Sequence, residues 1–443
     1  MSSATTAATA AATAALDKSA YKHYVLFVLL ISYVFNVADR GVYGVVLESI
    51  KQEIRASDFT LGLIGGLAFS VFHSFATIPI ARLADRWSRV NVLSIAVGVW
   101  SLATASCGLA WSYLSLFVGR AFTAIGEAGG TPPSHALIAD YFPAAKRATA
   151  LAAYAMAVPI GTAVGNYASG WFNEWYGWRT TFVLLGVPGL LIAPLIWLTV
   201  REPPHGYSDG RIAAARSAAP PFRTVCKFLL ARNSFVHMSV GAALHAVVWY
   251  SGTTFNAAFF QRSHDLSPGE TGSYIAAFSL IGALGSFAGG YLADRLSTRT
   301  GDRRWYMWVP AGACFVMVPV QFVAYLSAEL TAAVPIAFSL MFMLASMFFG
   351  PSFAVAQSLA TARMRSVSAS VLLFIQTIIG LTLGPAVVGL ISDKLQATQG
   401  DQSLAYAMSL IGIVNVWAAA HYFLAARRYR ADLATTARLD EAT

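Results

Sequence analysis

Four ionisable residues lie in stretches of the sequence that are otherwise apolar. Asp39 and Arg40 are adjacent in YVLFVLLISYVFNVADRGVYGVVL, and Arg120 and Glu127 lie in GRAFTAIGEAGG. A charged side chain at the centre of a membrane helix costs about 2.5–3.5 kcal/mol on insertion scales, so such residues usually have a function. Arginine keeps its charge, whereas a carboxylate in an apolar setting can accept a proton near neutral pH. The four residues therefore indicate proton uptake beside fixed positive charges.

Helical spacing groups these residues on two helices. Arg120 and Glu127 are seven positions apart, so they share one helix face about two turns from each other. Asn36, Asp39 and Tyr43 form one stripe of an earlier helix by the same reasoning. Two interpretations remain open from spacing alone: the carboxylates exchange protons, or the charges form a static ion pair that joins two helices.

The elements that carry these residues must cross a membrane. Of the 443 residues, 57% are hydrophobic and 12% are charged, whereas soluble domains have about 25% charged residues. About 20 apolar residues cross the hydrocarbon layer, and such segments begin near residues 24, 60, 91, 113, 148, 179, 234, 270, 305, 332, 367 and 403. We predict an all-α membrane protein with twelve transmembrane helices, and continuous helical spans exclude a β-barrel.

Basic residues are concentrated at one side of the predicted spans, which explains the net charge of +9. Lys18 and Lys22 precede the first span, the loops after even-numbered spans are rich in arginine, and Arg427, Arg428 and Arg430 follow the last span. The positive-inside rule then places both termini in the cytoplasm, so the charge is no evidence of nucleic-acid binding. The three cysteines are scattered without the spacing of a metal site, and their odd number argues against a disulfide framework.

The chain divides into two related halves. We predict a disordered tail over residues 1–20, six-helix bundles over 21–200 and 234–426, a polar linker over 201–233 and a second tail over 427–443. ARLADRWSR at 81–89 and GYLADRLSTR at 290–299 follow the second and eighth spans and repeat one motif. Such repeats are common in secondary transporters. We predict a cytoplasmic gate that consists of Asp85, Arg86, Arg89, Asp294 and Arg295. The alternative is that these charges serve only to set the topology of the chain.

These motifs resemble the major facilitator superfamily over essentially the whole chain. The resemblance rests on the repeated loop, on GRAFTAIGEAGG and on YGWRTTF. Within the superfamily, three segments resemble the bacterial-type Spinster-like lipid transporters. They are NVADRGVYGVVLESIKQE, GRAFTAIGEAGGTPPSHALIADYFP and AMAVPIGTAVGNYASG. The first loop departs from the usual pattern at Ala81, where the family has glycine, although alanine still allows close helix packing. The resemblance implies two pseudo-symmetric six-helix bundles.

The resemblance also places the first and fourth helices along a central cavity. We expect Arg40 to pair with Glu127 there, with Asp39 left to titrate, although either carboxylate could carry the proton. His73, His135 and His245 are candidates for a proton relay, because histidine titrates near neutrality. Aromatic residues of the seventh helix suit the apolar part of an amphiphile. The predicted substrate contacts are Arg40, Asn36, Tyr43, Arg120, His135, His245, Trp249 and Tyr250.

We therefore predict a secondary active transporter that moves an amphiphilic or lipid-related substrate by alternating access, with protons as the coupling ion and no other cofactor. The second hypothesis is an organic-anion:proton symporter, and the third is a non-transporting membrane sensor. The sequence holds no phosphate-binding loop, H-E-x-x-H or G-x-S-x-G motif, so we do not expect an enzyme. The expected partners are membrane lipids and the substrate, without nucleic acid, for a monomer in the bacterial inner membrane.

Overall fold

The computed structural model describes residues 19–204, 207, 222–327, 331–361 and 364–441. Within these ranges the regular elements are helices and no strand is present. The first half contains α2 (Ser19–Ile54), α3 (Asp58–Gly65), α4 (Leu67–Arg86), α5 (Arg89–Cys107), α6 (Tyr113–Glu127), α7 (Thr131–Tyr141), α8 (Ala144–Ala155) and α9 (Ala157–Thr199). The predicted tail up to residue 18 and linker residues 205–206 and 208–221 lie outside the described residues.

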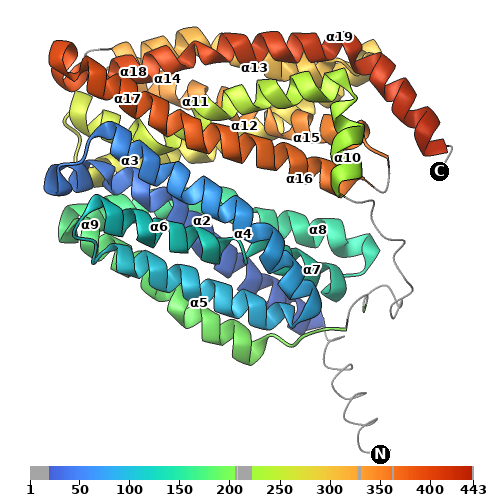
Figure 1. The fold of residues 1–443 in the computed structure, drawn as a ribbon, viewed down its shortest axis with the longest axis horizontal. Coiled ribbons are helices and arrows are strands. Elements are labelled where there is room, and N and C mark those ends of the chain that lie inside the picture. The colour runs from blue at the N-terminus through green and yellow to red at the C-terminus, as the bar shows by residue number, and fades with distance from the viewer. Residues whose placement is uncertain (1–18, 205–206, 208–221, 328–330, 362–363, 442–443) are drawn as a thin grey trace, which may run out of the picture. The chain divides into compact units, whose positions relative to one another are not determined.

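The second half contains a similar series of helices (Figure 1). They are α10 (Phe222–Leu230), α11 (Asn233–Ser263), α12 (Pro268–Thr300), α13 (Trp305–Leu326), α14 (Ala333–Ser346), α15 (Phe349–Ser358), α16 (Arg365–Gln376), the π-helical turn η2 (Thr377–Leu381), α17 (Thr382–Gln399), the 3₁₀ turn η3 (Gly400–Gln402), α18 (Ser403–Gly412) and α19 (Val414–Glu441).

Neighbouring helices join into twelve membrane spans in the described part of the chain. Short breaks interrupt single spans between α3 and α4, α6 and α7, α8 and α9, α14 and α15, and α18 and α19. Conversely, α9 contains two spans, because Gly177 has a φ of 78° and breaks the helix between the fifth and sixth. The span starts predicted from the sequence lie at or close to the observed starts, and the all-α fold with twelve spans is confirmed.

Eight helical stretches meet a strict criterion of length and hydropathy for crossing a membrane. Two of them, Thr149–Thr199 and Val367–Leu439, each contain two spans. The remaining spans fall below the criterion for local reasons: α6 and α7 are each short, and α11 contains several polar residues. The eight stretches are thus compatible with twelve spans.

Two stretches differ from the sequence prediction. Helix α10 lies inside the segment predicted to be a linker, where Val225 and Leu229 are buried one turn apart and give the helix an apolar face. Helix α19 continues to Glu441, well beyond residue 427 where we predicted a tail to begin. The alanine and arginine residues at its end are strong helix formers, so the helix continues past the apolar segment.

The residue contacts divide the chain into two compact units that do not coincide with the sequence halves. Unit 1 comprises residues up to 42, 72–165 and 175–216, and unit 2 comprises 43–71, 166–174 and 217 onward. The ends of the first, second and fifth spans therefore pack with the second half of the chain.

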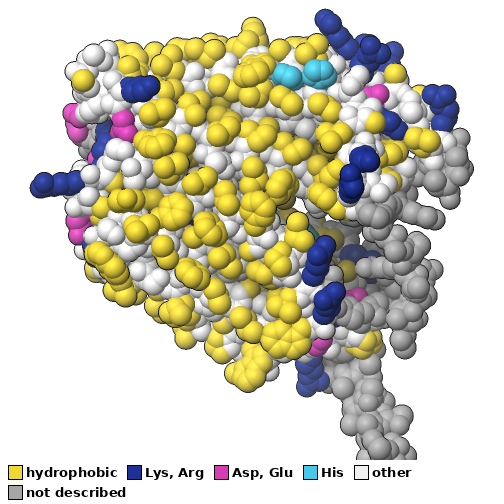
Figure 2. Space-filling model, in the orientation of Figure 1, with side chains coloured by type: hydrophobic (Ala, Val, Ile, Leu, Met, Phe, Trp, Pro, Cys, Tyr) yellow, Lys and Arg dark blue, Asp and Glu magenta, His cyan; other side chains and the backbone are white. Residues whose placement is uncertain are grey.

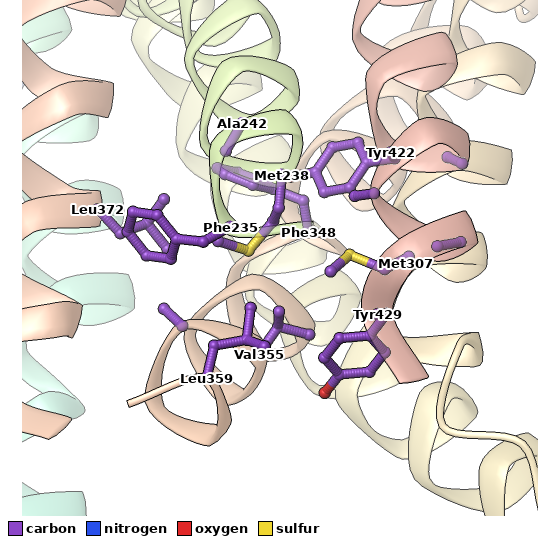
Figure 3. Close-up of a cluster of buried hydrophobic side chains, with 14 of the residues drawn as sticks. Phe235, Met238, Ala242, Met307, Phe348, Val355, Leu359, Leu372, Tyr422 and Tyr429 are labelled. Carbon is purple, nitrogen blue, oxygen red and sulfur yellow. The ribbon is translucent and has the colours of Figure 1, made fainter. Parts of the chain in front are cut away.

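Each unit has its own apolar core. In unit 1, Leu29, Trp100 and Tyr154 belong to one buried cluster. In unit 2, Phe235 and Met238 of α11 pack with Met307 of α13 and Tyr422 of α19, as Figure 3 shows. The same figure shows Val355 of α15 and Leu359, which directly follows α15, beside this group. These cores hold the helices that carry the candidate site.

Charged and apolar side chains occupy different parts of the surface. On the face drawn in Figure 2, apolar side chains cover the middle of the helices, whereas charged side chains gather toward their ends. Exposed apolar residues are numerous, for example Leu102, Leu191 and Phe287 at 62%, 70% and 75% exposure. This distribution is that of helices surrounded by lipid, so the chain is an integral membrane protein.

Candidate functional site

The four predicted charges lie together inside unit 1. Arg40 Nε donates to Glu127 Oε2 at 2.6 Å and joins α2 to α6. The Glu127 side chain is fully buried, whereas 39% of the Arg40 side chain is exposed. The predicted ion pair is therefore present, and its arginine is the member that a ligand can reach. We call Asp39, Arg40, Arg120 and Glu127 the charge cluster.

Asp39 has partners of its own. Thr104 Oγ1 on α5 donates to Asp39 Oδ2 at 2.6 Å, and Arg120 Nη1 lies 3.9 Å from Asp39 Oδ1. The side chains of Asp39 and Arg120 are each 3% exposed. Asp39 is thus not left alone beside the Arg40–Glu127 pair, because a hydroxyl and a second guanidinium face it. Sequence spacing could not reveal Thr104, which comes from a different helix.

Close helix packing sets the position of the charge cluster. At Gly165, an added Cβ would lie 2.5 Å from the Cα of Ala38, so the fifth span contacts the backbone of α2 next to Asp39. At Gly126, an added Cβ would lie 2.5 Å from the backbone nitrogen of Trp100, so α6 contacts α5 next to Glu127. Small residues at such positions let helix backbones approach in a membrane.

The other predicted residues of the first half lie at varied distances from the Arg40–Glu127 pair. Asn36 Oδ1 accepts from Arg40 Nη2 at 3.2 Å and so belongs to the same group. His73 Nδ1 lies 3.3 Å from the carbonyl oxygen of Ala124, one turn before Glu127. His135 is exposed and makes an edge contact with Tyr154. Tyr43 belongs to unit 2, where its hydroxyl donates to the Leu61 carbonyl at 2.7 Å.

The predicted residues of the second half divide between the interior and a cavity. His245 is 1% exposed, and its nitrogens lie 2.8 Å from Asn415 Oδ1 and 2.9 Å from the Ala345 carbonyl oxygen. Tyr250 is half-buried on the same helix. Trp249 is also half-buried and lines a cavity of about 30 Å³ inside unit 2.

The cavity in unit 2 is mainly apolar with a polar edge. Met317, Met341 and Phe342 line it together with Trp249. Polar groups come from Asn256, Gln321 and Tyr325, and the Tyr325 hydroxyl donates to Asn256 Oδ1 at 2.5 Å. Methionine and aromatic side chains give an adaptable surface for an apolar ligand.

A second group of charges in unit 2 was not predicted from the sequence. Arg262, in the last turn of α11, contacts Glu48 Oε2 at 2.5 Å and both oxygens of Asp58 at 2.8 and 2.9 Å. Lys51 Nζ donates to Asp58 Oδ1 at 2.8 Å. Asp58 is 1% exposed, so its charge depends on these partners. We call Glu48, Lys51, Asp58 and Arg262 the latch.

Close helix contacts in unit 2 lie along α2 and the second span, which also carry latch residues. An added Cβ would lie 2.4 Å from the Thr253 carbonyl oxygen at Gly44, and 2.4 Å from the Pro385 carbonyl oxygen at Gly62. The two sites join α2 to α11 and α3 to α17. About two turns further along the second span, Ser70 Oγ and Thr382 Oγ1 lie 2.6 Å apart. We call these contacts the seam, and they leave no room for a side chain at either glycine.

Comparison with known proteins identifies the family. The family model described as the Major Facilitator Superfamily matches residues 29–385. This chain belongs to the major facilitator superfamily. Within it the chain is Spinster-like, as two solved structures and two relatives described as spinster homologs show.

The solved structures similar to this transporter include two crystal structures of a bacterial homolog of the human lysosomal transporter Spinster. The inward-facing, unoccupied form has a TM-score of 0.86 and 30% identity, over 94% of this chain and 99% of the other. The inward-facing, occupied form has a TM-score of 0.82 and 31% identity, over 93% and 98%.

Curated relatives are described as transporters of several kinds. An MFS-type efflux pump of Mycolicibacterium smegmatis is 32% identical over 91% of this chain and 92% of its own length. Protein spinster homolog 1 of Rattus norvegicus is 29% identical over 54% of this chain and 46% of its own. A hexuronate transporter of Bacillus subtilis is 23% identical over 63% and 66%.

The first copy of the repeated motif in this transporter runs from the end of α4 to the start of α5, and the second copy lies at the end of α12. Asp85 lies in α4, with its side chain outside the described part, and Arg86 is exposed. In the second copy, exposed Asp294 accepts from the Tyr306 hydroxyl, and Arg295 donates to the Tyr291 hydroxyl at 2.5 Å. The gate role of these residues stays a prediction.

Arg89 of the first copy is buried inside unit 1. Its guanidinium contacts Asp140, donates to Glu202 Oε1 at 2.6 Å and donates to the Pro203 carbonyl at 2.6 Å. With 2% exposure, Arg89 joins α5, α7 and the segment after α9. Its guanidinium therefore has an intra-unit structural role that the motif alone did not indicate.

Proposed function

We propose that this Spinster-like transporter moves an amphiphilic, lipid-related substrate by alternating access and couples the movement to protons. The observation that carries the proposal is the charge cluster, in which a partly exposed arginine is bonded to a fully buried carboxylate. An arrangement that only joined two helices would not need an arginine with 39% of its side chain exposed.

Proton uptake would change what Arg40 can bind. Protonation of Glu127 removes the negative charge that faces Arg40 Nε, while Arg40 keeps its own proton at any physiological pH. The guanidinium would then be available to an anionic group of the substrate, with the geometry that suits carboxylates and phosphates. Loss of the proton would restore the pair and release the substrate group. Glu127 is thus the carboxylate that controls Arg40 in this proposal.

Asp39 would act on the second arginine of the cluster. Thr104 Oγ1 donates to Asp39 Oδ2, and such a hydrogen bond stabilises the ionised form of the carboxylate. Its charge balances Arg120, which is 2% exposed. A proton on Asp39 would leave Arg120 with less compensation in a buried place, which favours a rearrangement of α2 against α6. Both carboxylates therefore take part, each through a different arginine.

The apolar part of the substrate would bind to the second half of the chain. The cavity beside Trp249 offers methionine and aromatic side chains, with few polar groups. At about 30 Å³ the cavity has room for little more than a water molecule, so an alkyl chain could enter only if the methionine side chains around it moved aside. The relative described as an efflux pump supports movement of a compound across the membrane.

Alternating access would require the latch and the seam to open. Residues 43–71 and 166–174 pack with the second half inside unit 2, and the latch residues come from α2, α3 and α11. For the substrate to pass at the end of the transporter that carries the latch, these segments must separate from the second half of the chain. The arginine-rich loops favour both termini in the cytoplasm of a bacterial inner membrane, so the latch would face away from the cytoplasm.

Transport in proteoliposomes with an imposed pH gradient tests the coupling. Asp39→Asn and Glu127→Gln should each lose gradient-driven accumulation, and Arg40→Ala should lose transport even without a gradient. Glu270→Gln is the matched control, because glutamine can keep the helix-capping bonds of Glu270 to Ser267. Gradient-driven accumulation at the parental rate in both carboxamide variants would refute proton coupling through this cluster.

An organic-anion:proton symporter is the alternative, since two arginines in one cluster could bind a carboxylate and a hexuronate transporter is among the relatives. Competition separates the two. Saturable inhibition by lysophospholipids or sphingoid lipids supports the amphiphile, and inhibition by sugar acids with no effect of lipids supports the organic anion.

A further inference from the structure

A groove opens on the surface of unit 1 between α5 and the last turns of α9. It has a volume of about 370 Å³. Trp87, Asn91 and Ser94 line one side, and Ala193, Pro194 and Trp197 line the other. Figure 1 draws the end of α9 alongside α5. None of the charge-cluster residues lines this groove, so it is a separate feature of the molecule.

The groove exists because α5 and α9 are tightly packed at one level and separate at another. An added Cβ would lie 2.6 Å from the Ser101 carbonyl at Gly186, and 1.9 Å from Ser101 Oγ at Gly189. At Gly98 it would lie at ordinary contact distance, 3.8 Å, from the Ala193 Cβ. The helices therefore diverge from Ser101 toward the start of α5, and the groove fills the space between them.

One buried hydroxyl without a hydrogen-bond partner among the described residues lines this otherwise apolar groove. Ser94 is 7% exposed, and its Oγ has no hydrogen-bond partner among the described residues. Leaving a buried hydroxyl unpaired costs free energy, so a ligand oxygen there would be favoured. Asn91 adds an amide on the same side. Pro194 lines the other side. Because proline has no N–H, the carbonyl four residues earlier in the helix lacks its usual helical donor.

The position of the groove indicates what fills it. Trp87 and Trp197 are 49% and 61% exposed and lie next to the helix ends, as tryptophans do at the level of lipid headgroups. Arg86 precedes Trp87, and Arg201 follows Trp197 by one turn; both are exposed. Arginines at this level attract anionic headgroups. Further into the membrane, Ile95 and Leu191 are 54% and 70% exposed and offer a path for an acyl chain.

We propose that this groove binds an anionic glycerophospholipid of the surrounding membrane. Ester or phosphate oxygens accept from Ser94 Oγ and the Asn91 amide, the two tryptophans flank the glycerol region, and the arginines at the helix ends attract the headgroup. This lipid binds from the membrane side of unit 1. It is distinct from any transported substrate, so the proposal stands independently of the transport function.

Native mass spectrometry of the purified full chain with added phosphatidylglycerol tests the proposal. The parent should retain one phosphatidylglycerol more than Ser94→Leu, which fills the groove and removes the hydroxyl. Ser106→Leu is the matched control, since it makes the same change at an exposed position of the same helix, and it should retain lipid like the parent. An equal concentration of phosphatidylcholine should not displace the retained lipid.

Tryptophan quenching by brominated phosphatidylglycerol provides a second measurement that does not depend on Ser94→Leu folding. Trp197→Phe should remove a saturable part of the quenching, whereas Trp111→Phe, at an 81% exposed position outside the groove, should not. Equal retention by the parent and a folded Ser94→Leu, displacement by phosphatidylcholine as readily as by phosphatidylglycerol, or unchanged saturable quenching in Trp197→Phe would each overturn the proposal.

Discussion

The latch in unit 2 makes a quantitative prediction about Arg262. This residue is 9% exposed and contacts Glu48 and Asp58, whose side chains are 13% and 1% exposed. Removing one partner of a buried ion pair costs about 3–5 kcal/mol, because the other charge stays buried without it. Asp58 retains Lys51 and Ser392 as partners, so we take the lower figure of about 3 kcal/mol.

A loss of this size should shift the closed arrangement of unit 2 substantially. At about 1.4 kcal/mol for each factor of ten, 3 kcal/mol corresponds to a shift of about 100- to 200-fold toward open forms. Ser70 is a suitable reporter, because it is fully buried and lies in the seam against Thr382. In a Ser70→Cys background, Arg262→Ala should raise the rate of maleimide labelling in detergent by up to that factor.

Two companion variants sharpen the test. Lys51→Ala removes a half-buried lysine that contacts Asp58 but not Glu48. Because partly exposed ion pairs contribute about 0–1 kcal/mol, the labelling rate should rise by less than about tenfold. Arg55→Ala changes an exposed arginine outside the latch and should leave the rate as it is. If a folded Arg262→Ala protein labels Ser70→Cys no faster than its parent, the latch does not hold the seam closed.

Three further predictions concern stability. Gly62→Ala places a Cβ 2.4 Å from the Pro385 carbonyl oxygen, and overpacking of about 1–3 kcal/mol should lower the Tm in detergent, which Gly290→Ala, with open space around its Cβ, should not. Glu202→Gln weakens the surroundings of buried Arg89 and should cost about 1–3 kcal/mol, measured by denaturant titration. Hydrogen bonds from Arg304 lower the pKa of Asp302 from 3.8 to about 2; its stabilising contribution is therefore present above pH 4 and lost as the pH falls through 2, and Asp302→Asn should flatten the Tm profile across that window.

Local patterns in the sequence were enough to predict the spans and one ion pair. Apolar length identifies a membrane helix directly, because each helix satisfies its own backbone groups in lipid. Arg40 and Glu127 could be paired because few charges lie at span centres, so few partners were available. The identity of the family followed from motifs on the same helices.

Contacts between distant segments could not be predicted in the same way. Thr104 beside Asp39 and Arg262 beside Asp58 are ordinary residues in their own segments, and only the packing of several helices makes them partners. Arg89 belongs to a loop motif, yet its position at the start of α5 buries it against Asp140 and Glu202. The type of a charged residue and its helical spacing predict which face of a helix it occupies, but not which helix packs against that face.

Helix α2 runs without interruption for 36 residues, from Ser19 to Ile54. It therefore carries Arg40 of the charge cluster and Glu48 of the latch on one rigid rod, about 12 Å apart along its axis at 1.5 Å per residue. The angular offset between these side chains is fixed by the helix itself. One alanine inserted between Val42 and Tyr43 would turn the latch end by about 100° relative to the cluster. In the proposed transport cycle, the uninterrupted register of α2 would therefore determine which way the latch residues turn when the cluster residues turn.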